Sequence, residues 1–326
     1  MSSPKRDTFV LPEGDGALTQ GAALLRVGGL VAFATETVYG LGADATSGVA
    51  VAGIYAAKGR PAFNPLIAHV ASVDDALREG VFSVEALALA RALWPGPLTL
   101  VVPTAPGCSV CDLARAGLDT VALRVPGHAF ARALISAAGR PIAAPSANRS
   151  GHVSPTTAAH VLADLGGLID LVIDGGPARV GVESTLIACI GGATRLLRPG
   201  EVSRDAAQAV IGHALDQAPP GGEAVIAPGQ LASHYAPRAA LRLEARELRA
   251  GEAGLDFGGV FGAGQGGRIF DLSPRRNLTE AAARLFAALR MLDDSGAAVI
   301  ACASLPDEGL GEAINDRLRK AAAPRA

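Results

Sequence analysis

Cysteine, lysine and aromatic residues are scarce in this 326-residue chain. Its four cysteines are too widely spread to form a disulfide framework, and Cys108 and Cys111 have no second pair of Cys or His nearby to complete a zinc site. No apolar run is long enough to span a bilayer, and the polar N-terminus does not resemble a signal peptide. We therefore expect a soluble, cytoplasmic protein with reduced thiols and no membrane partner.

The chain also lacks an excess of charge of either sign. A formal net charge of −2 and an isoelectric point near 6.3 disfavour the broad basic surface that holds nucleic acid through its phosphates. Apolar residues make up 49% of the sequence. A chain of this length and composition is expected to form one large core and a second, smaller one, and therefore two domains.

Several common motifs of nucleotide and hydrolase chemistry are missing. The sequence contains no G-x-x-x-x-G-K-[ST], no H-E-x-x-H and no G-x-S-x-G. Residues 262–267 match the dinucleotide pattern G-x-G-x-x-G, but the strand-like residues 268–271 follow where a helix would be required. We therefore expect no dinucleotide site at this position.

Positive charge and a constrained backbone coincide after a predicted helix at residues 49–57. Gly59 can end this helix in a left-handed cap, and the prolines that follow favour an extended chain. The side chains of Lys58, Arg60 and Asn64 then lie on a loop with little conformational entropy left to lose, which suits a phosphate site. Stabilisation of the helix dipole by Lys58 and Arg60 explains the same charges equally well.

Polar residues also follow or interrupt other predicted strands, where ligands of open α/β sheets commonly bind. Each has an ordinary alternative in turn, strand or helix-cap chemistry. Arg124 is the clearest case, because it lies on an otherwise apolar strand and must find an anion. A ligand carboxylate and an internal acidic side chain remain equal candidates for that anion.

Seven short motifs in order resemble the YrdC-like threonylcarbamoyl-AMP synthase family. They are TETVYGLG at 35–42, KGRP at 58–61, NPL at 64–66, WPGPLT at 94–99, APSANRSG at 144–151, EST at 183–185 and RPG at 198–200. Residues 234–237 and 309–318 resemble the longer, two-domain branch. The resemblance implies an α/β fold with a twisted mixed sheet around a large concave cleft, and a small C-terminal α/β, Rossmann-like domain. We expect a flexible N-terminus at 1–15, a catalytic domain at 16–213, a linker over the active site at 214–240 and the small domain at 241–326.

The family's activity is the synthesis of threonylcarbamoyl-adenylate and pyrophosphate from L-threonine, bicarbonate and ATP. The resemblance therefore implies a nucleotidyltransferase. Its adenylate product is used to modify tRNA next to the anticodon, so a downstream tRNA transferase complex is an implied partner. Mg²⁺ is expected to arrive with the ATP phosphates, and direct tRNA binding is expected to be weak or absent. Two alternatives remain open: an RNA-binding or ribosome-associated module, and a domain that forms carbamoyl-adenylate from carbamoyl phosphate.

By the same resemblance, Lys58 and Arg60 are the catalytic residues that hold the triphosphate. The ATP site is expected to comprise Lys58, Arg60, Asn64, Thr120, Ser146, Asn148, Ser154, Arg198, His234 and Tyr235. The threonine site is expected to comprise Thr37, His69, Arg124, Ala144 and Ser184. Two departures stand out: Ala34 replaces a usual proline, and residues 229–233 lack the basic side chains expected before His234.

Overall fold

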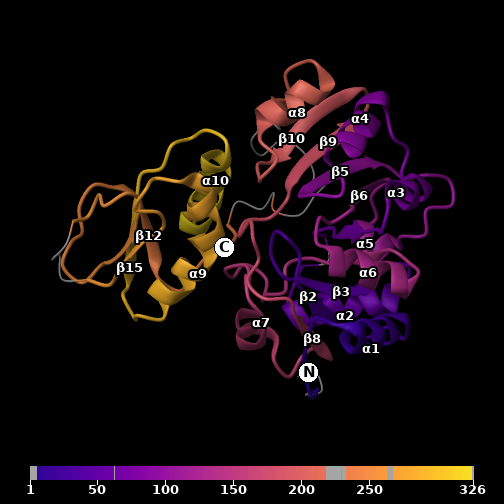
Figure 1. The fold of residues 1–326 in the computed structure, drawn as a ribbon, viewed down its shortest axis with the longest axis horizontal. Coiled ribbons are helices and arrows are strands. Elements are labelled where there is room, and N and C mark those ends of the chain that lie inside the picture. The colour runs from indigo at the N-terminus through magenta and orange to yellow at the C-terminus, as the bar shows by residue number, and fades with distance from the viewer. Residues whose placement is uncertain (1–5, 62, 218–228, 230–232, 263–266, 325–326) are drawn as a thin grey trace.

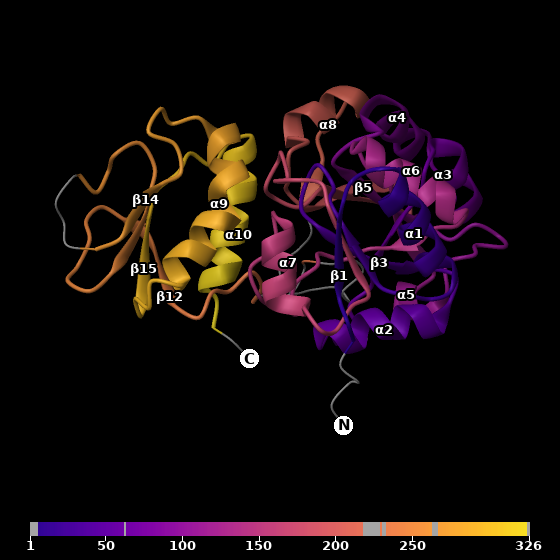
Figure 2. The ribbon, with the colours of Figure 1, turned by 60° about the horizontal axis from the view of Figure 1, so that its bottom comes forward.

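The computed structural model describes residues 6–61, 63–217, 229, 233–262 and 267–324. The chain forms a larger N-terminal unit and a smaller C-terminal unit, each an α/β structure with its own sheet (Figure 1). The helices α9 and α10 of the smaller unit lie between its sheet and the larger unit in both ribbon views (Figure 2). This arrangement confirms the predicted fold class.

Within the described residues, the larger unit has an eleven-stranded mixed sheet in the order β1-β8-β2-β3-β7-β4-β6-β5-β9-β10-β11. Its strands are β1 (Phe9–Pro12), β2 (Val31–Phe33), β3 (Gly40–Asp44), β4 (Ile67–His69), β5 (Leu98–Pro103), β6 (Thr120–Arg124), β7 (Ile142–Ala143), β8 (Leu171–Asp174), β9 (Thr185–Ile190), β10 (Ala193–Arg198) and β11 (Asp216–Gln217). Its helices are α1 (Asp15–Arg26), α2 (Gly48–Lys58), α3 (Val73–Glu79), α4 (Val84–Leu93), α5 (Asp112–Arg115), α6 (Ala129–Ala138), α7 (Ala158–Leu165) and α8 (Arg204–Ile211).

The register of the central strands brings distant residues together. His69 lies opposite Arg124 where β4 and β6 run parallel, and opposite Ile142 where β4 and β7 run antiparallel. Strand β5 connects this group to β9, with Leu98 opposite Thr185. The ends of β4, β6, β7 and β9 therefore meet at one part of the sheet.

The smaller unit is a four-stranded parallel sheet in the order β12-β15-β13-β14. Its elements are β12 (Ala240–Ala245), β13 (Ala253–Asp256), β14 (Ile269–Asp271), α9 (Leu278–Asp293), β15 (Val299–Ala303) and α10 (Leu310–Ala322). Parallel strands require crossover connections, and α9 lies in the one between β14 and β15. Helix α10 follows β15 and lies on the same side of the sheet as α9.

The two units share one apolar core. Val38, Val153, Val180 and Val182 of the larger unit belong to the same buried cluster as the apolar side chains of α9, α10 and β15. Ion pairs at 2.7 Å between Arg290 and Asp164, and at 2.9 Å between Arg204 and Glu312, flank this contact. A groove of about 1040 Å³ also lies between the units, and residues from both line it.

Several local predictions are confirmed because the signals for them lie within a few residues. Ser47 precedes the apolar run of α2 and is predicted to cap it, and its side chain does so. Gly59 ends that helix in the left-handed conformation at φ 59°. Asn277 caps α9, as the capping-box pattern of residues 277–280 predicts. Gly191 and Gly192 lie between two apolar runs and predict a hairpin, which β9 and β10 form. The apolar pattern predicts a helix from residue 314, but this helix begins at Leu310, so α10 is one turn longer than the pattern indicates.

Other predictions are wrong. The N-terminus is not a flexible tail throughout, because β1 (Phe9–Pro12) pairs in parallel with β8. The apolar residues near Phe261 also predict a strand at 258–261. This described segment forms none, because the Asp256 carboxylate accepts the backbone N–H groups of Phe257, Val260 and Phe261 and turns the chain. The expected linker begins with strand β11 and ends at β12; most of its remaining residues lie outside the described ones, as does most of the glycine-rich run at 262–267.

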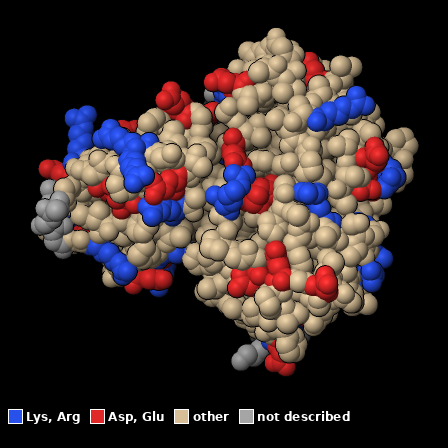
Figure 3. Space-filling view, viewed as in Figure 1, with Lys and Arg blue, Asp and Glu red and all other residues tan. Residues whose placement is uncertain are grey.

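The described residues contain no helix that combines the length and the apolar character needed to cross a membrane. On the face seen in Figure 3, basic and acidic side chains are interspersed, and large areas carry neither. This face offers no continuous stripe of positive charge among the described residues.

Candidate active site

A small cavity of about 50 Å³ lies where the central strands end. Ten of the predicted site residues line it: Thr37, Arg60, His69, Arg124, Ala144, Ser146, Ser184, Arg198, His234 and Tyr235. The remaining lining residues are Val38, Ile67, Pro145, Glu183 and Gly229. The wall thus combines side chains from both predicted substrate sets with residues of the predicted linker.

The cations at the end of α2 are buried without an acidic partner. Lys58 Nζ donates to the backbone oxygens of Ser146 and Asn148, and the Arg60 guanidinium donates to those of Asn64 and Pro65 at 3.2 and 2.9 Å. Within the described residues, neither Lys58 nor Arg60 forms an ion pair. The left-handed Gly59 between them lets the chain leave the helix, so that the two charges reach the same region.

Burial and mutual repulsion perturb these cations. Burial and the nearby Arg60 charge hold the pKa of Lys58 well below its usual value. Burial lowers the pKa of Arg60 to about 10, with Arg198 contributing repulsion. Burial also lowers the pKa of Arg198, whose guanidinium donates to the backbone oxygen and hydroxyl of Ser184 at 3.1 Å each. An anion that entered the cavity would therefore stabilise the charged forms of Arg60 and Arg198, which line it, and of the nearby Lys58.

The other side of the cavity is built around Arg124. Its guanidinium lies 2.7 Å from Glu36 and donates to the Thr37 hydroxyl at 3.0 Å. Burial would raise the pKa of Glu36, but the Arg124 charge and backbone donors outweigh burial and lower it to about 2. Of the two anions that the sequence left open for Arg124, the structure contains the internal one, while the arginine still lines the cavity.

His69 is neutral at physiological pH. Burial, together with the adjacent Arg124 charge, lowers the pKa of His69 to about 3. Its Nδ1 has no hydrogen-bond partner among the described residues. A buried imidazole nitrogen in this state can accept or donate a hydrogen bond to a ligand, depending on its tautomer.

His234 and Tyr235 form the wall that comes from the C-terminal side of the linker. Burial lowers the pKa of His234 to about 3 and raises that of Tyr235 to about 12. The Tyr235 ring stacks on Phe286 of α9 with centroids 5.6 Å apart, and its backbone has φ 64°, which is unusual for a residue other than glycine. The Tyr235 hydroxyl and His234 Nδ1 lack partners among the described residues.

Five predicted residues do not line the cavity. Lys58 and Asn148 contact each other beside it, and both polar atoms of the Asn64 side chain are buried without a partner among the described residues. Ser154 donates to Glu183 in the cavity wall rather than capping α7, a role that Thr157 takes. Thr120 begins β6 opposite Pro103, and nothing in its contacts brings it to the cavity.

Three charged residues of the site were not predicted as site residues. Glu36 and Glu183 lie within motifs of the sequence, but their charge partners are 88 and 134 residues away. The third is Arg317 of α10, which is fully buried and lies 2.8 Å from Glu183. Arg317 lies within the motif at 309–318, and a polar residue on an apolar helix face is a second sequence signal that points to it.

The described residues hold no group of three or more His, Cys, Asp or Glu side chains that could bind a metal ion. The carboxylates nearest the cavity, Glu36 and Glu183, are each committed to an arginine. The protein side chains alone therefore do not fit a metal site. The binding of Mg²⁺ through the phosphates of ATP therefore stays a prediction.

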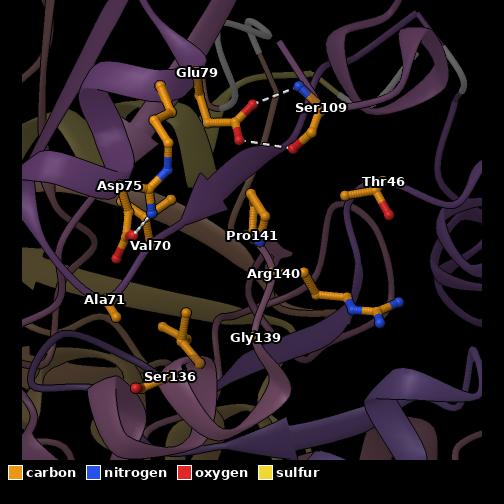
Figure 4. Close-up of a pocket in the computed structure, with 12 residues that line it drawn as sticks. Thr46, Val70, Ala71, Asp75, Glu79, Ser109, Ser136, Gly139, Arg140 and Pro141 are labelled. Atoms are coloured by element: carbon orange, nitrogen blue, oxygen red, sulfur yellow. Dashed lines mark hydrogen bonds and ion pairs between the residues drawn. The ribbon is translucent and has the colours of Figure 1, made fainter. Parts of the chain in front are cut away.

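A larger cavity of about 600 Å³ lies elsewhere, lined by residues of α3, α6 and the loops near Thr46 and Pro141 (Figure 4). Its charged groups are satisfied within the protein. The Glu79 carboxylate accepts the backbone N–H and hydroxyl of Ser109 at 2.7 Å each, and Arg78 pairs with Asp75. None of the predicted site residues lines this cavity, and it presents no unpaired buried group to a ligand.

Comparisons with known proteins agree with this geometry. Residues 23–200 match the Sua5/YciO/YrdC family model, described as telomere recombination, and residues 202–323 match the C-terminal domain of threonylcarbamoyl-AMP synthase. The chain is 42% identical to a Bacillus subtilis threonylcarbamoyl-AMP synthase over 98% of its own length and 96% of the relative's. It is 44% identical to the Pyrococcus abyssi protein of that name over 93% of each chain.

A solved structure has the same architecture. It is P. abyssi Sua5 in complex with L-threonine, which superposes with a TM-score of 0.88 at 39% identity and 97% coverage of both chains. The predicted family resemblance is thereby confirmed over both units. This chain belongs to the Sua5/YciO/YrdC family, in its two-domain form with a threonylcarbamoyl-AMP synthase C-terminal domain.

Proposed function

We propose that this protein is a threonylcarbamoyl-AMP synthase that converts L-threonine, bicarbonate and ATP into threonylcarbamoyl-adenylate and pyrophosphate. The observation that carries the proposal is a group of buried cations at one end of the cavity. Arg60 and Arg198 line this end and Lys58 lies beside it, while Arg124 and Thr37 line the other end. The names of the relatives and the threonine complex of P. abyssi Sua5 support the same conclusion.

The cationic end suits the triphosphate of ATP. Desolvation destabilises a charged side chain unless an anion compensates it, and the lowered pKa values of Lys58 and Arg60 reflect that penalty. Phosphate oxygens can accept hydrogen bonds from the forked guanidinium of Arg60 and from the compact ammonium of Lys58. Substrate binding would replace the backbone oxygens that now accept from Lys58.

The other end suits an amino acid with a hydroxyl group. Arg124 can share its guanidinium between Glu36 and a substrate carboxylate, while Thr37, Ser184 and the neutral His69 offer hydrogen bonds to the amine and the hydroxyl. Ile67 and Ala144 supply apolar surface for a methyl group. Such a surface discriminates threonine from serine by only about ten- to two-hundred-fold.

The reaction then needs positioning and charge neutralisation rather than a protein nucleophile. Threonine and bicarbonate first give a carbamate with loss of water. One carbamate oxygen attacks the α-phosphorus of ATP, the bond from that phosphorus to the bridging oxygen breaks, and pyrophosphate leaves with the electron pair. Lys58, Arg60 and Arg198 would stabilise the charge on the phosphoryl oxygens. Mg²⁺ bound to the phosphates would neutralise further negative charge.

The present cavity is smaller than the substrates. At about 50 Å³ it holds little more than ordered water, so binding requires that part of its wall move. His234 and Tyr235 are the candidates, because they line the cavity and belong to the described end of the linker. Their return over bound substrates would shield the labile adenylate from water.

The product of this reaction would be used by a second enzyme. An adenylate of threonylcarbamic acid is an activated acyl donor, and the family's role assigns it to tRNA modification next to the anticodon in the cytoplasm. A downstream transferase complex would take the adenylate, and direct tRNA binding by this chain would be weak.

Mass spectrometry of the products from ATP, ¹³C-bicarbonate and L-threonine tests the proposal directly. The expected product is an adenylate that contains both threonine and the labelled carbon, with pyrophosphate released in equal amount. Reactions without threonine, and with carbamoyl phosphate in place of bicarbonate, are the controls. Formation of an adenylate from carbamoyl phosphate without threonine would contradict the proposal and support a carbamoyl-adenylate-forming domain. Binding of tRNA without any threonine-dependent turnover of ATP would contradict it and support an RNA-binding module.

A further inference from the structure

Arg317 connects the smaller unit to the wall of the candidate active site. Its guanidinium is fully buried, lies 2.8 Å from the Glu183 carboxylate through Nε, and donates to the Glu183 backbone oxygen at 3.4 Å. The second carboxylate oxygen of Glu183 accepts the Ser154 hydroxyl. Glu183 therefore has both oxygens engaged, although it lines a cavity whose other charges are mostly cations.

Arg317 is itself held by several groups of its own unit and of the linker. Asp316 accepts from its Nη1 at 2.6 Å and also pairs with Lys320 at 2.8 Å. The Arg317 guanidinium carbon lies 5.3 Å from the centroid of the Tyr235 ring, within cation–π range. These contacts fix the guanidinium at one position between α10, Tyr235 and Glu183.

The negative charge of Glu183 is unfavourable for phosphate binding in the cavity that this residue lines. Burial would raise the pKa of Glu183, but the Arg317 charge, followed by that of Arg198, lowers it, so the carboxylate stays ionised. An ionised carboxylate in the wall would repel phosphate oxygens or pair with a cation that binds them. In the described residues Glu183 pairs with Arg317, and no ion pair joins it to Arg198.

We propose that Arg317 is a positioning residue for the nucleotide: it neutralises Glu183 and keeps this carboxylate from competing with phosphate for Arg198. The proposal rests on the function inferred above, because it requires a phosphate-bearing ligand in the cavity. It gives the C-terminal unit a specific part in ATP binding, through one helix side chain that reaches the catalytic wall. Arg317 touches neither substrate and acts only through Glu183.

Four variants test this inference: Arg317→Gln, Glu183→Gln, the double variant, and Arg319→Gln as a control. Arg319 lies on the same helix but is exposed, with its nearest acidic atom 3.9 Å away. The dissociation constant of ATP is measured by calorimetry, and kcat and the KM values for ATP and threonine are measured by product formation. Thermal unfolding of each variant reports whether it is folded.

Arg317→Gln is expected to weaken ATP binding at least tenfold, because Glu183 then turns toward Arg198 and the phosphates, while the KM for threonine changes less than threefold. Glu183→Gln is expected to tighten ATP binding two- to threefold, and the double variant is expected to bind ATP within threefold of the wild type. Arg319→Gln is expected to change none of these values. If Arg317→Gln does not fold, Glu183→Gln and the double variant still test the charge effect.

A purely structural role for Arg317 makes a different prediction. The loss in Arg317→Gln would then persist in the double variant, and that result would overturn the inference, as would unchanged ATP binding in Arg317→Gln. If the wild type binds ATP and makes the adenylate, and Arg317→Gln does both equally well, the proposed function stands and only this inference is removed. Wild-type protein that does not bind ATP would remove both.

Discussion

Arg124 and Glu36 form a buried ion pair with 2.7 Å between their charged atoms, although 88 residues separate them in the chain. Their side chains are 4% and 8% exposed, so little water screens the pair. Glu36 follows β2 and Arg124 ends β6, so the pair joins the loop after β2 to the centre of the sheet. It also aims the Arg124 guanidinium at the Thr37 hydroxyl in the cavity wall.

Replacement of this carboxylate, Glu36→Gln, is expected to lower the free energy of unfolding by about 3 kcal/mol at pH 7, because Arg124 is left buried without a counter-charge. The pKa of Glu36 is lowered from 4.5 to about 2, so its contribution is complete above pH 4.5 and is lost as the pH falls toward 2. The variant's stability should therefore vary less with pH in that range than that of the wild type. Urea unfolding at pH 7, 4 and 3 measures both effects.

Asp112→Asn is the matched control for this prediction. It also removes an acidic partner of an arginine, Arg115, but the Asp112 side chain is 85% exposed. The expected loss is below about 1 kcal/mol, as for other exposed pairs. Stability of Glu36→Gln within 1 kcal/mol of the wild type would contradict the view that burial makes the Arg124 pair strong.

Distance along the chain explains why the sequence predicted only part of this site. The ends of α2 depend on Ser47 and Gly59, which act on neighbouring backbone groups, and both were predicted from local rules. The partner of Arg124 was left open between a ligand and an internal acid, because periodicity shows that a residue is buried and not what it contacts. Family resemblance supplied most of the cavity residues.

Distance along the chain also explains why the sequence did not predict strand β1 or the pair of Glu183 and Arg317. Strand β1 pairs with β8 across about 160 residues, and its exposed Phe9 and Val10 do not alternate as a half-buried strand would. Glu183 and Arg317 belong to different units, so neither local propensity nor motif spacing relates them. These contacts depend on how two sheets and their helices pack together.

Lys58→Met is expected to reduce adenylate formation at least about a hundredfold, because the variant loses a positive charge at the transferring phosphoryl group. The free energy of unfolding should change by less than about 1 kcal/mol. Two backbone oxygens lose their donor, but a desolvated ammonium with a strongly lowered pKa is also removed. Product formation by mass spectrometry and thermal unfolding measure the two results.

Arg91→Met controls for the loss of one positive charge, because Arg91 is exposed on α4 and belongs to no part of the site. It should retain wild-type activity and stability. A Lys58→Met protein that makes adenylate at more than a tenth of the wild-type rate would rule out a direct phosphate contact.

Two tyrosines allow a paired test of an unpartnered hydroxyl. The Tyr235 hydroxyl is buried without a partner among the described residues, whereas that of Tyr55 donates to the backbone oxygens of Asn64 and Leu113 at 3.1 and 3.2 Å. Tyr235→Phe should therefore raise the free energy of unfolding by about 1 kcal/mol, and Tyr55→Phe should lower it by a similar amount. Urea unfolding without ligand measures both.

The same substitution should have the opposite effect on function. If the Tyr235 hydroxyl contacts the nucleotide, Tyr235→Phe raises the KM for ATP several-fold, since one hydrogen bond is lost on binding. A more stable variant with an unchanged KM for ATP would show that the hydroxyl does not reach the ligand.

Two buried histidines predict how stability depends on pH. Burial, with repulsion from Arg124 at His69, lowers the pKa of both His69 and His234 from 6.5 to about 3. The folded protein therefore favours the neutral rings, and this contribution is complete above pH 6.5 and is lost as the pH falls toward 3. At pH 5 each histidine should have lost about 2 kcal/mol of the free energy of unfolding relative to pH 7.5.

His69→Gln and His234→Gln isolate these two contributions, because glutamine does not titrate. Each variant is expected to reduce the fall in unfolding free energy between pH 7.5 and pH 5 by about 2 kcal/mol, whatever its stability at pH 7.5. His213 is a control of opposite sign, because the hydrogen bond to Glu85 raises its pKa in the folded protein. Its contribution to the free energy of unfolding is therefore present at low pH and is lost as the pH rises through the pKa of the folded state. His213→Gln should leave the fall unchanged or make it slightly steeper. A wild-type protein equally stable at pH 7.5 and pH 5 would mean that both rings protonate in the folded state, and the neutral His69 invoked for threonine binding would have to be abandoned.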